Sequence, residues 1–140
     1  MGSFLDSVGL EFDHIAADEV RAHIEATEDH HTPWGIVHGG LYATIIETVA
    51  TFGAVTAVQA SGQVAVGVNN QTDFLRPHRT GRLTVHARPI QQGKTLQLWQ
   101  VEISNDEGKL VARGQVRLFN QPAAAGQRLP LPFSAAEASR

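Results

Sequence analysis

The sequence predicts an α+β domain in which one antiparallel sheet covers a single long, apolar helix. Two observations support this prediction. Residues 35–55, "GIVHGGLYATIIETVATFGAV", carry apolar side chains at helical spacing. After Gly62 the pattern changes to segments in which apolar and polar residues alternate, as in half-buried antiparallel strands. A helix that is apolar around most of its circumference can be buried on nearly all sides by such a sheet.

Length and composition limit the class of protein. The 140 residues suit one domain, and 42% hydrophobic with 18% charged residues is typical of a globular chain. A net charge of −3 favours neither nucleic acid nor an anionic membrane surface as a partner. The chain has no cysteine, which excludes disulfides, a thiolate nucleophile and thiolate metal ligands.

The sequence also predicts a cytoplasmic location. Its first residues lack the basic and apolar regions of a secretory signal peptide. We expect no membrane span, because no apolar run approaches the roughly 20 residues that a span requires.

The first third of the chain carries weak signals. Residues 1–9 are interpreted as a lead-in segment, and residues 10–27 as one half-exposed strand, because Val20, Ala22, Ile24 and Ala26 alternate with polar residues. Residues 28–34, "EDHHTPW", are predicted to form a polar loop.

The helix has two distinct stripes. An apolar face is formed by residues spaced four, four and three apart: Leu41, Ile45, Val49 and Phe52. A neighbouring stripe of low bulk repeats every four residues: Gly39, Ala43, Glu47 and Thr51. A backbone or a ligand could approach this second stripe closely, and Gly62 is the predicted helix end.

Four strands are predicted after the helix, at residues 64–75, 82–90, 94–104 and 109–119. They are expected to follow one another as an antiparallel meander with short connections. The domain is assigned to residues 1–120, and the Pro- and Ala-rich residues 121–140 are assigned to a C-terminal tail.

Three segments together resemble the hotdog-fold acyl-CoA thioesterases. They are "PWGIVHGGLYATIIETVAT" (33–51), "DFLRP" (73–77) and "GKTLQLWQVEISNDEGKLVARGQVRLF" (93–119). The specific feature is His-Gly-Gly with an acid seven residues after the second glycine, followed later by the second and third segments. The sequence is most similar to the branch of phenylacetic-acid-degradation and Arthrobacter-type 4-hydroxybenzoyl-CoA thioesterases.

The resemblance implies an assembly as well as a fold. In this family the sheet wraps the helix, two subunits join edge to edge, and dimers often pair into tetramers. The site lies at the dimer interface and draws residues from two chains. We therefore expect a homo-oligomer, dimer or homotetramer, that acts on an acyl-CoA, with coenzyme A as part of the substrate and no separate cofactor.

The resemblance also implies residue roles. Glu47 matches the catalytic carboxylate, either a nucleophile or a general base on water, which would explain an acid within an apolar run. The backbone N–H of Gly39, at the helix N-terminus, is the candidate oxyanion donor. His38 would support this region, and Thr51 would hold the water or the acid. We expect Glu47 to be partly buried.

Other positions are assigned to substrate binding. Gly40 leaves room for the thioester, and Trp34 is a candidate wall of the acyl pocket. Thr32 stands where the family often has Gln or Asn, so either Thr32 or His31 would take that role. Arg76, Arg79, Arg82 and Lys94 could form a patch for the CoA phosphates. No metal site is expected, because neighbouring His30 and His31 do not usually point to one ion.

Blander alternatives stay open. Glu47 could be a structural acid paired with a buried Arg or His, and Thr51 could bond only its own helix backbone. A non-catalytic acyl-CoA-binding hotdog protein is the main alternative function. An inactive structural subunit is another, whereas the acid/histidine pairing of hotdog dehydratases is not found. The acyl group, aryl or medium-chain, is not determined by the sequence.

Overall fold

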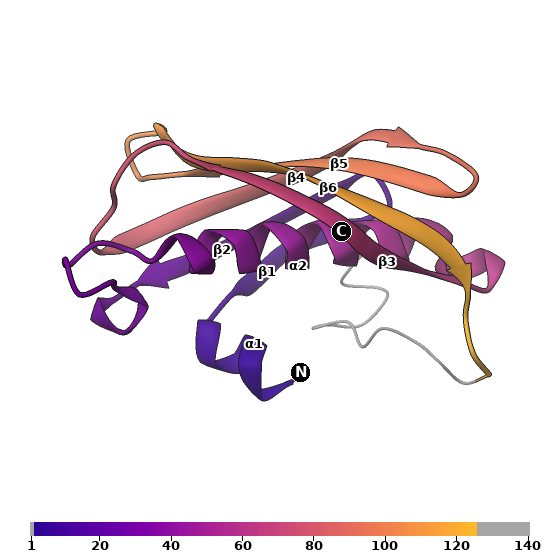
Figure 1. The fold of residues 1–140 in the computed structure, drawn as a ribbon, viewed down its shortest axis with the longest axis horizontal. Helices are drawn as coiled ribbons and strands as arrows, with labels where there is room; N and C mark the ends of the chain where they lie inside the picture. The colour runs from indigo at the N-terminus through magenta and orange to yellow at the C-terminus, as the bar shows by residue number, and fades with distance from the viewer. Residues whose placement is uncertain (1, 126–140) are drawn as a thin grey trace.

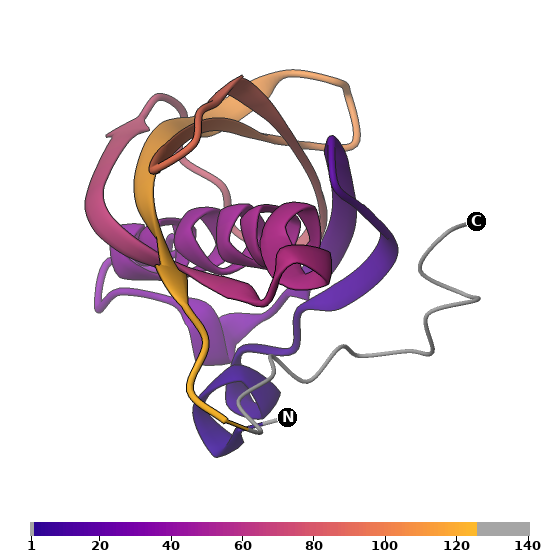
Figure 2. The ribbon, with the colours of Figure 1, turned by 90° about the vertical axis from the view of Figure 1, so that its right-hand side faces the viewer.

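The computed structural model describes residues 2–125, which form one curved sheet around a central helix (Figure 1). The elements in chain order are α1 (Ser3–Val8), β1 (Glu11–Ala16), β2 (Glu19–Ala26), α2 (Gly39–Val58), β3 (Gln63–Phe74), β4 (Gly81–Gln92), β5 (Leu96–Ser104) and β6 (Leu110–Pro122). The six strands are antiparallel, in the order β1-β2-β4-β5-β6-β3. Viewed along α2, the sheet arches over the helix and leaves one side open (Figure 2). The predicted α+β layout is confirmed.

The strands after Gly62 are confirmed, but the predicted meander is wrong for β3. Strands β4, β5 and β6 are consecutive neighbours, whereas β3 pairs with β6 at the far edge of the sheet. The reason is non-local: residues 81–87 of β4 pair with β2, so the place beside β4 is already taken. Strand β6 reaches Pro122, and the remainder of the predicted tail from 126 onward lies outside the described residues.

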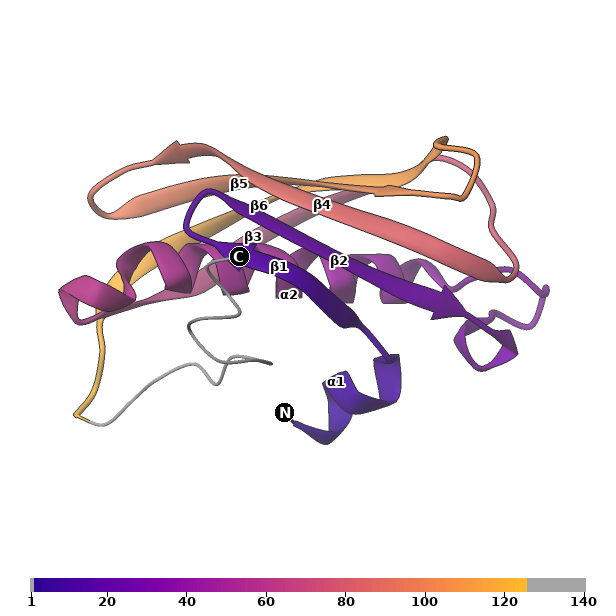
Figure 3. The same ribbon diagram turned by 180° about the vertical axis from the view of Figure 1, so that it is seen from behind.

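The N-terminal region holds more structure than predicted. Residues 3–8 form the short helix α1, and the expected single strand is a hairpin of β1 and β2, seen from behind in Figure 3. A register shift between Phe12 and His14 interrupts the alternation of β1. The alternation on which the prediction depended lies in β2 and is regular there, whereas the bulge breaks the period-2 pattern of β1 and so hid the second strand.

The core lies between α2 and the concave face of the sheet. The predicted apolar face is confirmed at Ile45, Val49 and Phe52, which are buried, while Leu41 is half-buried. On the opposite wall the Trp99 ring is fully buried, and its Nε1–H donates to Gln97 Oε1 at 2.8 Å. Gln97 in turn donates to the Ala54 carbonyl at 3.0 Å, so the sheet is hydrogen-bonded to the helix it covers.

The central helix exceeds the expected length of an apolar run. The segment Gly39–Ser61 is long and apolar enough to cross a membrane by length and composition alone, so the premise that no apolar run approaches about 20 residues was wrong. Of its most apolar 18 residues, 56% are buried inside the domain, as in the core helix of a globular protein. The buried helix here packs against its own sheet.

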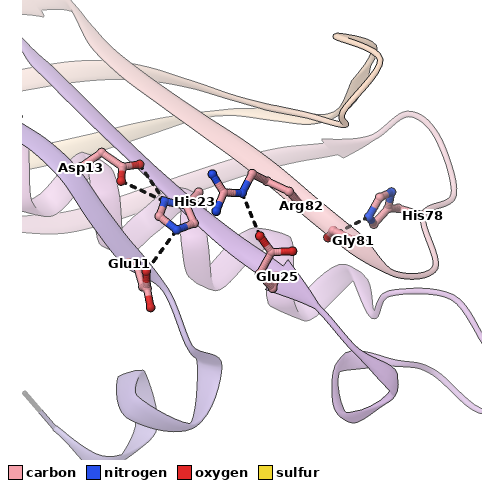
Figure 4. Close-up of polar contacts among 7 residues, drawn as sticks. All are labelled: Glu11, Asp13, His23, Glu25, His78, Gly81 and Arg82. Atoms are coloured by element: carbon pink, nitrogen blue, oxygen red, sulfur yellow. Dashed lines mark hydrogen bonds and ion pairs between the residues drawn. The ribbon is translucent and has the colours of Figure 1, made fainter.

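Ion pairs lie on the outer face of β1, β2 and β4 (Figure 4). The His23 ring lies between two carboxylates, with Nδ1 2.8 Å from Asp13 Oδ2 and Nε2 3.1 Å from Glu11 Oε2. Arg82 Nε donates to Glu25 Oε1 at 2.8 Å, a contact that raises the pKa of the guanidinium. These pairs join neighbouring strands on the solvent side and lie outside the core.

Candidate functional site

The N-terminus of α2 presents one free backbone donor. His38 is the N-cap, and its Nδ1 accepts the Gly40 N–H at 2.8 Å, while the Leu41 N–H donates to the His38 carbonyl at 3.0 Å. Within residues 2–125, the Gly39 N–H has no hydrogen-bond partner. Because Nδ1 of His38 accepts a bond, the imidazole proton resides on Nε2. The helix start therefore offers the Gly39 amide at its positive end.

A cavity of about 730 Å³ opens at this helix end. Five of the predicted site residues line it: Thr32, His38, Gly39, Gly40 and Arg76. Most of the remaining wall is apolar and is supplied by Ile36, Val37, Tyr42, Phe74, Leu75 and Pro77. A polar helix end beside an apolar pocket suits a ligand with a carbonyl at one end of a hydrophobic group.

A hydrogen bond joins the segment before α2 to the segment between β3 and β4, and both segments line the cavity. The Val37 N–H donates to the His78 carbonyl at 2.8 Å, and the His78 ring lies 3.4 Å from the Gly81 carbonyl (Figure 4). The Leu75 N–H donates to the Val111 carbonyl at 2.9 Å and so anchors the end of β3 to β6. The cavity is thus shaped by segments that are distant in sequence.

Gly39 allows the ring of Phe74 to approach the helix closely. A Cβ built at this position would lie 2.9 Å from Cζ of Phe74, whose ring packs on the helix start. Phe74 is 61% exposed, so its ring stands at the mouth of the cavity rather than in the core.

Glu47 lies outside the cavity wall. It follows Gly39 by eight residues, which places it about 12 Å further along the helix axis. It is exposed in this single chain, so the expected partial burial is not observed there. Among the described residues its carboxylate has no hydrogen bond or ion pair, which gives no support to a structural acid paired with a buried base.

Thr51 and Trp34 do not contact the cavity within one chain. The Thr51 hydroxyl donates to the Glu47 backbone carbonyl at 2.8 Å, the backbone bond that was the alternative interpretation. Trp34 is 81% exposed on the loop before α2, and its backbone N–H donates to Thr32 Oγ1 at 3.2 Å.

Thr32 and His31 are separated by the structure. Thr32 lines the cavity, and its backbone N–H is fixed by the Ile36 carbonyl at 2.7 Å. The His31 ring instead contacts the Arg79 carbonyl. Of the two candidates for the position that is often Gln or Asn in the family, only Thr32 is at the cavity.

The predicted basic patch is divided. Arg76 lines the cavity, and Arg79 Nη1 donates to the Gly35 carbonyl at 3.4 Å on the same side of the molecule. Arg82 is engaged by Glu25. Lys94 lies at the other end of the sheet. Its carbonyl accepts a hydrogen bond from Asn120 of β6, whereas Val111 of β6 bonds the segment that lines the cavity. Nine residues, or roughly 30 Å of extended strand, separate Val111 from Asn120.

Sequence reasoning missed Tyr42 and Phe74 as cavity residues. Tyr42 is the single tyrosine of the chain and lies within the apolar helix run, where its hydroxyl was a signal that could have been followed. Phe74 lies within the quoted "DFLRP" segment, but its proximity to Gly39 depends on tertiary structure. No group of three or more His, Asp or Glu residues suited to a metal ion occurs in the part of the chain that the structure describes.

Comparison with known proteins is consistent across sequence and structure. Residues 35–112 match the Thioesterase superfamily. A Mycobacterium tuberculosis protein named as an esterase is 38% identical over 122 residues, 86% of this chain and 87% of that protein. Its structure superposes with a TM-score of 0.85 and covers 88% of this chain and 99% of that one.

Two further relatives extend this picture. The structure of AziG from S. sahachiroi is 40% identical, with a TM-score of 0.83 and coverage of 86% of this chain and 98% of that chain. A 1,4-dihydroxy-2-naphthoyl-CoA hydrolase from Escherichia coli is 26% identical over 109 residues, 78% of this chain and 79% of that enzyme.

Proposed function

The chain belongs to the thioesterase superfamily, and from this premise we propose that it hydrolyses an aryl- or medium-chain acyl-CoA to the free acid and CoA. It has the hotdog fold of that superfamily and is a thioester hydrolase of acyl-CoA. The observation that carries the proposal is the free amide of Gly39, a residue at the N-terminus of α2 that lines a largely apolar cavity. The aromatic side chains in its wall favour the aryl class, and the E. coli relative is named for an aryl-CoA substrate. The branch of phenylacetate and 4-hydroxybenzoyl-CoA thioesterases stays a proposal, supported by the resemblance of residues 33–51, 73–77 and 93–119.

The proposed site polarises the thioester carbonyl at the helix end. The Gly39 N–H would donate to the carbonyl oxygen, and the helix dipole would stabilise the negative charge that develops there. His38 holds the adjacent Gly40 amide and carries its own proton on Nε2, available to the same region. Thr32 and Gly40 would border the bound thioester.

Glu47 is proposed as the catalytic carboxylate, supplied by a second copy of the chain. Reacting groups must approach within about 3 Å, whereas Gly39 and Glu47 of one chain are separated by about 12 Å along the helix. An exposed, unpaired carboxylate is compatible with a partner that covers it. As nucleophile, Glu47 would form an anhydride that water then cleaves; as base, it would take a proton from attacking water. As base, Glu47 would pass that proton to the departing CoA thiolate; as nucleophile, it would expel CoA as the thiolate, which takes its proton from the water that cleaves the anhydride.

Strand β3 supplies a candidate edge for this dimer. It is the last strand of the sheet, and Val66, Val68 and Phe74 along it are 44%, 49% and 61% exposed. A long, exposed, apolar edge is a template for pairing with another strand. Thr51 and Trp34 are proposed to take their roles only in that assembly. Pairing into a homotetramer and a cytoplasmic location remain predictions.

The CoA phosphates are proposed to bind Arg76 and Arg79 at the rim of the cavity. Because Lys94 lies at the opposite end of the sheet, it could join this patch only from a partner subunit. The proposed reaction requires no cofactor besides the CoA of the substrate.

The test is thiol release from a panel of aryl and aliphatic acyl-CoAs with wild type and Glu47→Gln. The amide keeps the shape of the side chain and removes its basicity. We expect turnover by wild type and a loss of about 100-fold or more in the variant. Glu28→Gln, the same change at an exposed residue of the loop before α2, should retain full activity.

Two outcomes would contradict the proposal. Equal rates of wild type and Glu47→Gln would exclude Glu47 as the catalytic carboxylate. Binding of acyl-CoA without turnover of any thioester would instead support the non-catalytic acyl-CoA-binding alternative.

A further inference from the structure

The Tyr42 hydroxyl is a buried polar group without a partner. The residue is 3% exposed, and within residues 2–125 its Oη makes no hydrogen bond. Burial raises the pKa of this phenol to about 12, as expected for a group shielded from water. Buried tyrosine hydroxyls usually find a partner, and leaving one unpaired disfavours the folded state.

A structural role does not account for this hydroxyl. If Tyr42 only filled space between α2 and the sheet, phenylalanine would provide the same ring without the desolvated oxygen. A tyrosine is favoured when the hydroxyl gains a partner in another state of the protein. The position of the side chain indicates what that partner could be.

Tyr42 forms part of the cavity wall, just beyond the proposed oxyanion donor. It lies three residues after Gly39, about 4.5 Å along the helix axis. Its ring is 6.3 Å from that of Phe74, with an interplanar angle of 36°. In the free chain the Tyr42 oxygen is enclosed, so an acyl group whose carbonyl is held at Gly39 would reach it by displacing the neighbouring, exposed Phe74 ring.

We infer that the Tyr42 hydroxyl is a specificity-determining group that hydrogen-bonds a hydroxyl substituent on the acyl part of the substrate. This inference rests on the proposed function, because it assumes that the acyl group occupies this cavity. The phenol can donate or accept one bond, so it pairs with a substrate hydroxyl without needing charge. An acyl group that lacks such a substituent leaves the Tyr42 hydroxyl without a hydrogen-bond partner, so the site discriminates against it.

The test compares wild type with Tyr42→Phe on benzoyl-CoA and its three monohydroxylated derivatives. Wild type should prefer at least one hydroxylated derivative by about tenfold in kcat/KM, the contribution typical of one neutral hydrogen bond. Tyr42→Phe should abolish that preference, because it slows the hydroxylated substrate about tenfold more than it slows benzoyl-CoA. The Tm of Tyr42→Phe should equal or exceed that of wild type, because no structural bond is lost.

Several results would overturn the inference. An unchanged preference in Tyr42→Phe would do so, as would an equal loss on all four substrates. A lower Tm would show that the hydroxyl has a structural partner. If wild type hydrolyses none of the four thioesters, the proposed function fails for aryl substrates. The role of Tyr42 in recognition is then tested by calorimetric measurement of the binding of the same thioesters. Tighter binding of a hydroxylated thioester by wild type, lost in Tyr42→Phe, would still support Tyr42 as the recognition group. Equal affinities of wild type for all four thioesters would refute this role.

Discussion

Replacing Gly39 by proline would remove one hydrogen-bond donor from the cavity while retaining the helix. Gly39 is the first helical residue after the N-cap, the position at which proline is most readily accepted. His38 already has an extended backbone, φ −68° and ψ 134°, as a residue before proline requires. The variant therefore tests the proposed oxyanion donor with little expected loss of fold.

The magnitude follows from the hydrogen bonds of the first turn. The Gly40 and Leu41 amides are both occupied by His38, so Gly39 supplies the free backbone donor at this helix end within the described residues. Loss of one such donor lowers kcat by about 100- to 1000-fold, or roughly 3–4 kcal/mol of transition-state stabilisation. We expect a decrease of this size for Gly39→Pro in a thiol-release assay.

Gly39→Ala is the matched control, because it adds a Cβ but keeps the N–H. The added Cβ would approach the Phe74 ring, which is exposed and can move away. We expect Gly39→Ala to retain most activity, with melting curves near wild type for both variants. Equal losses in the two variants would refute the donor role and assign the requirement for glycine to packing against Phe74.

Two further predictions concern stability and ionisation. Gly53→Ala would place a Cβ 3.0 Å from Cζ2 of Trp99 and nearer still to other atoms of that buried ring, so urea denaturation should show a loss of about 1–3 kcal/mol. Gly67→Ala, whose added Cβ would meet no atom within 4 Å, is the control, and equal midpoints for the two variants would contradict the packing argument. The absorbance of tyrosinate should report a Tyr42 pKa of about 12 rather than 10, without interference, because it is the single tyrosine. The unfolded chain loses this proton at a lower pH than the folded chain, so the stability contributed by the neutral phenol is full below pH 10 and is lost as pH rises toward 12. The Tyr42→Phe variant should lack this loss of stability. A titration midpoint of the phenol near pH 10 would refute burial of the hydroxyl.

The local features of this protein were determined by the sequence. The spacing of Ile45, Val49 and Phe52 predicted the buried face of α2. Gly62, with φ 75°, ends the helical region where a left-handed residue was expected. The His-Gly-Gly segment predicted the helix start at Gly39 and the family. These features depend on neighbours along the chain, and periodicity reports them directly.

The order of the strands and the composition of the cavity were decided only by the tertiary structure. Alternation identifies β3 as a strand but contains no information on its partner, so its place beside β6 could not be predicted. The same holds for the contact of Phe74 with Gly39 and for the distance of Lys94 from Arg76. Glu47 was expected to be partly buried at a subunit interface, and in the single chain it is exposed. Burial depends on which surfaces pack together, and a pattern along one chain does not specify that packing.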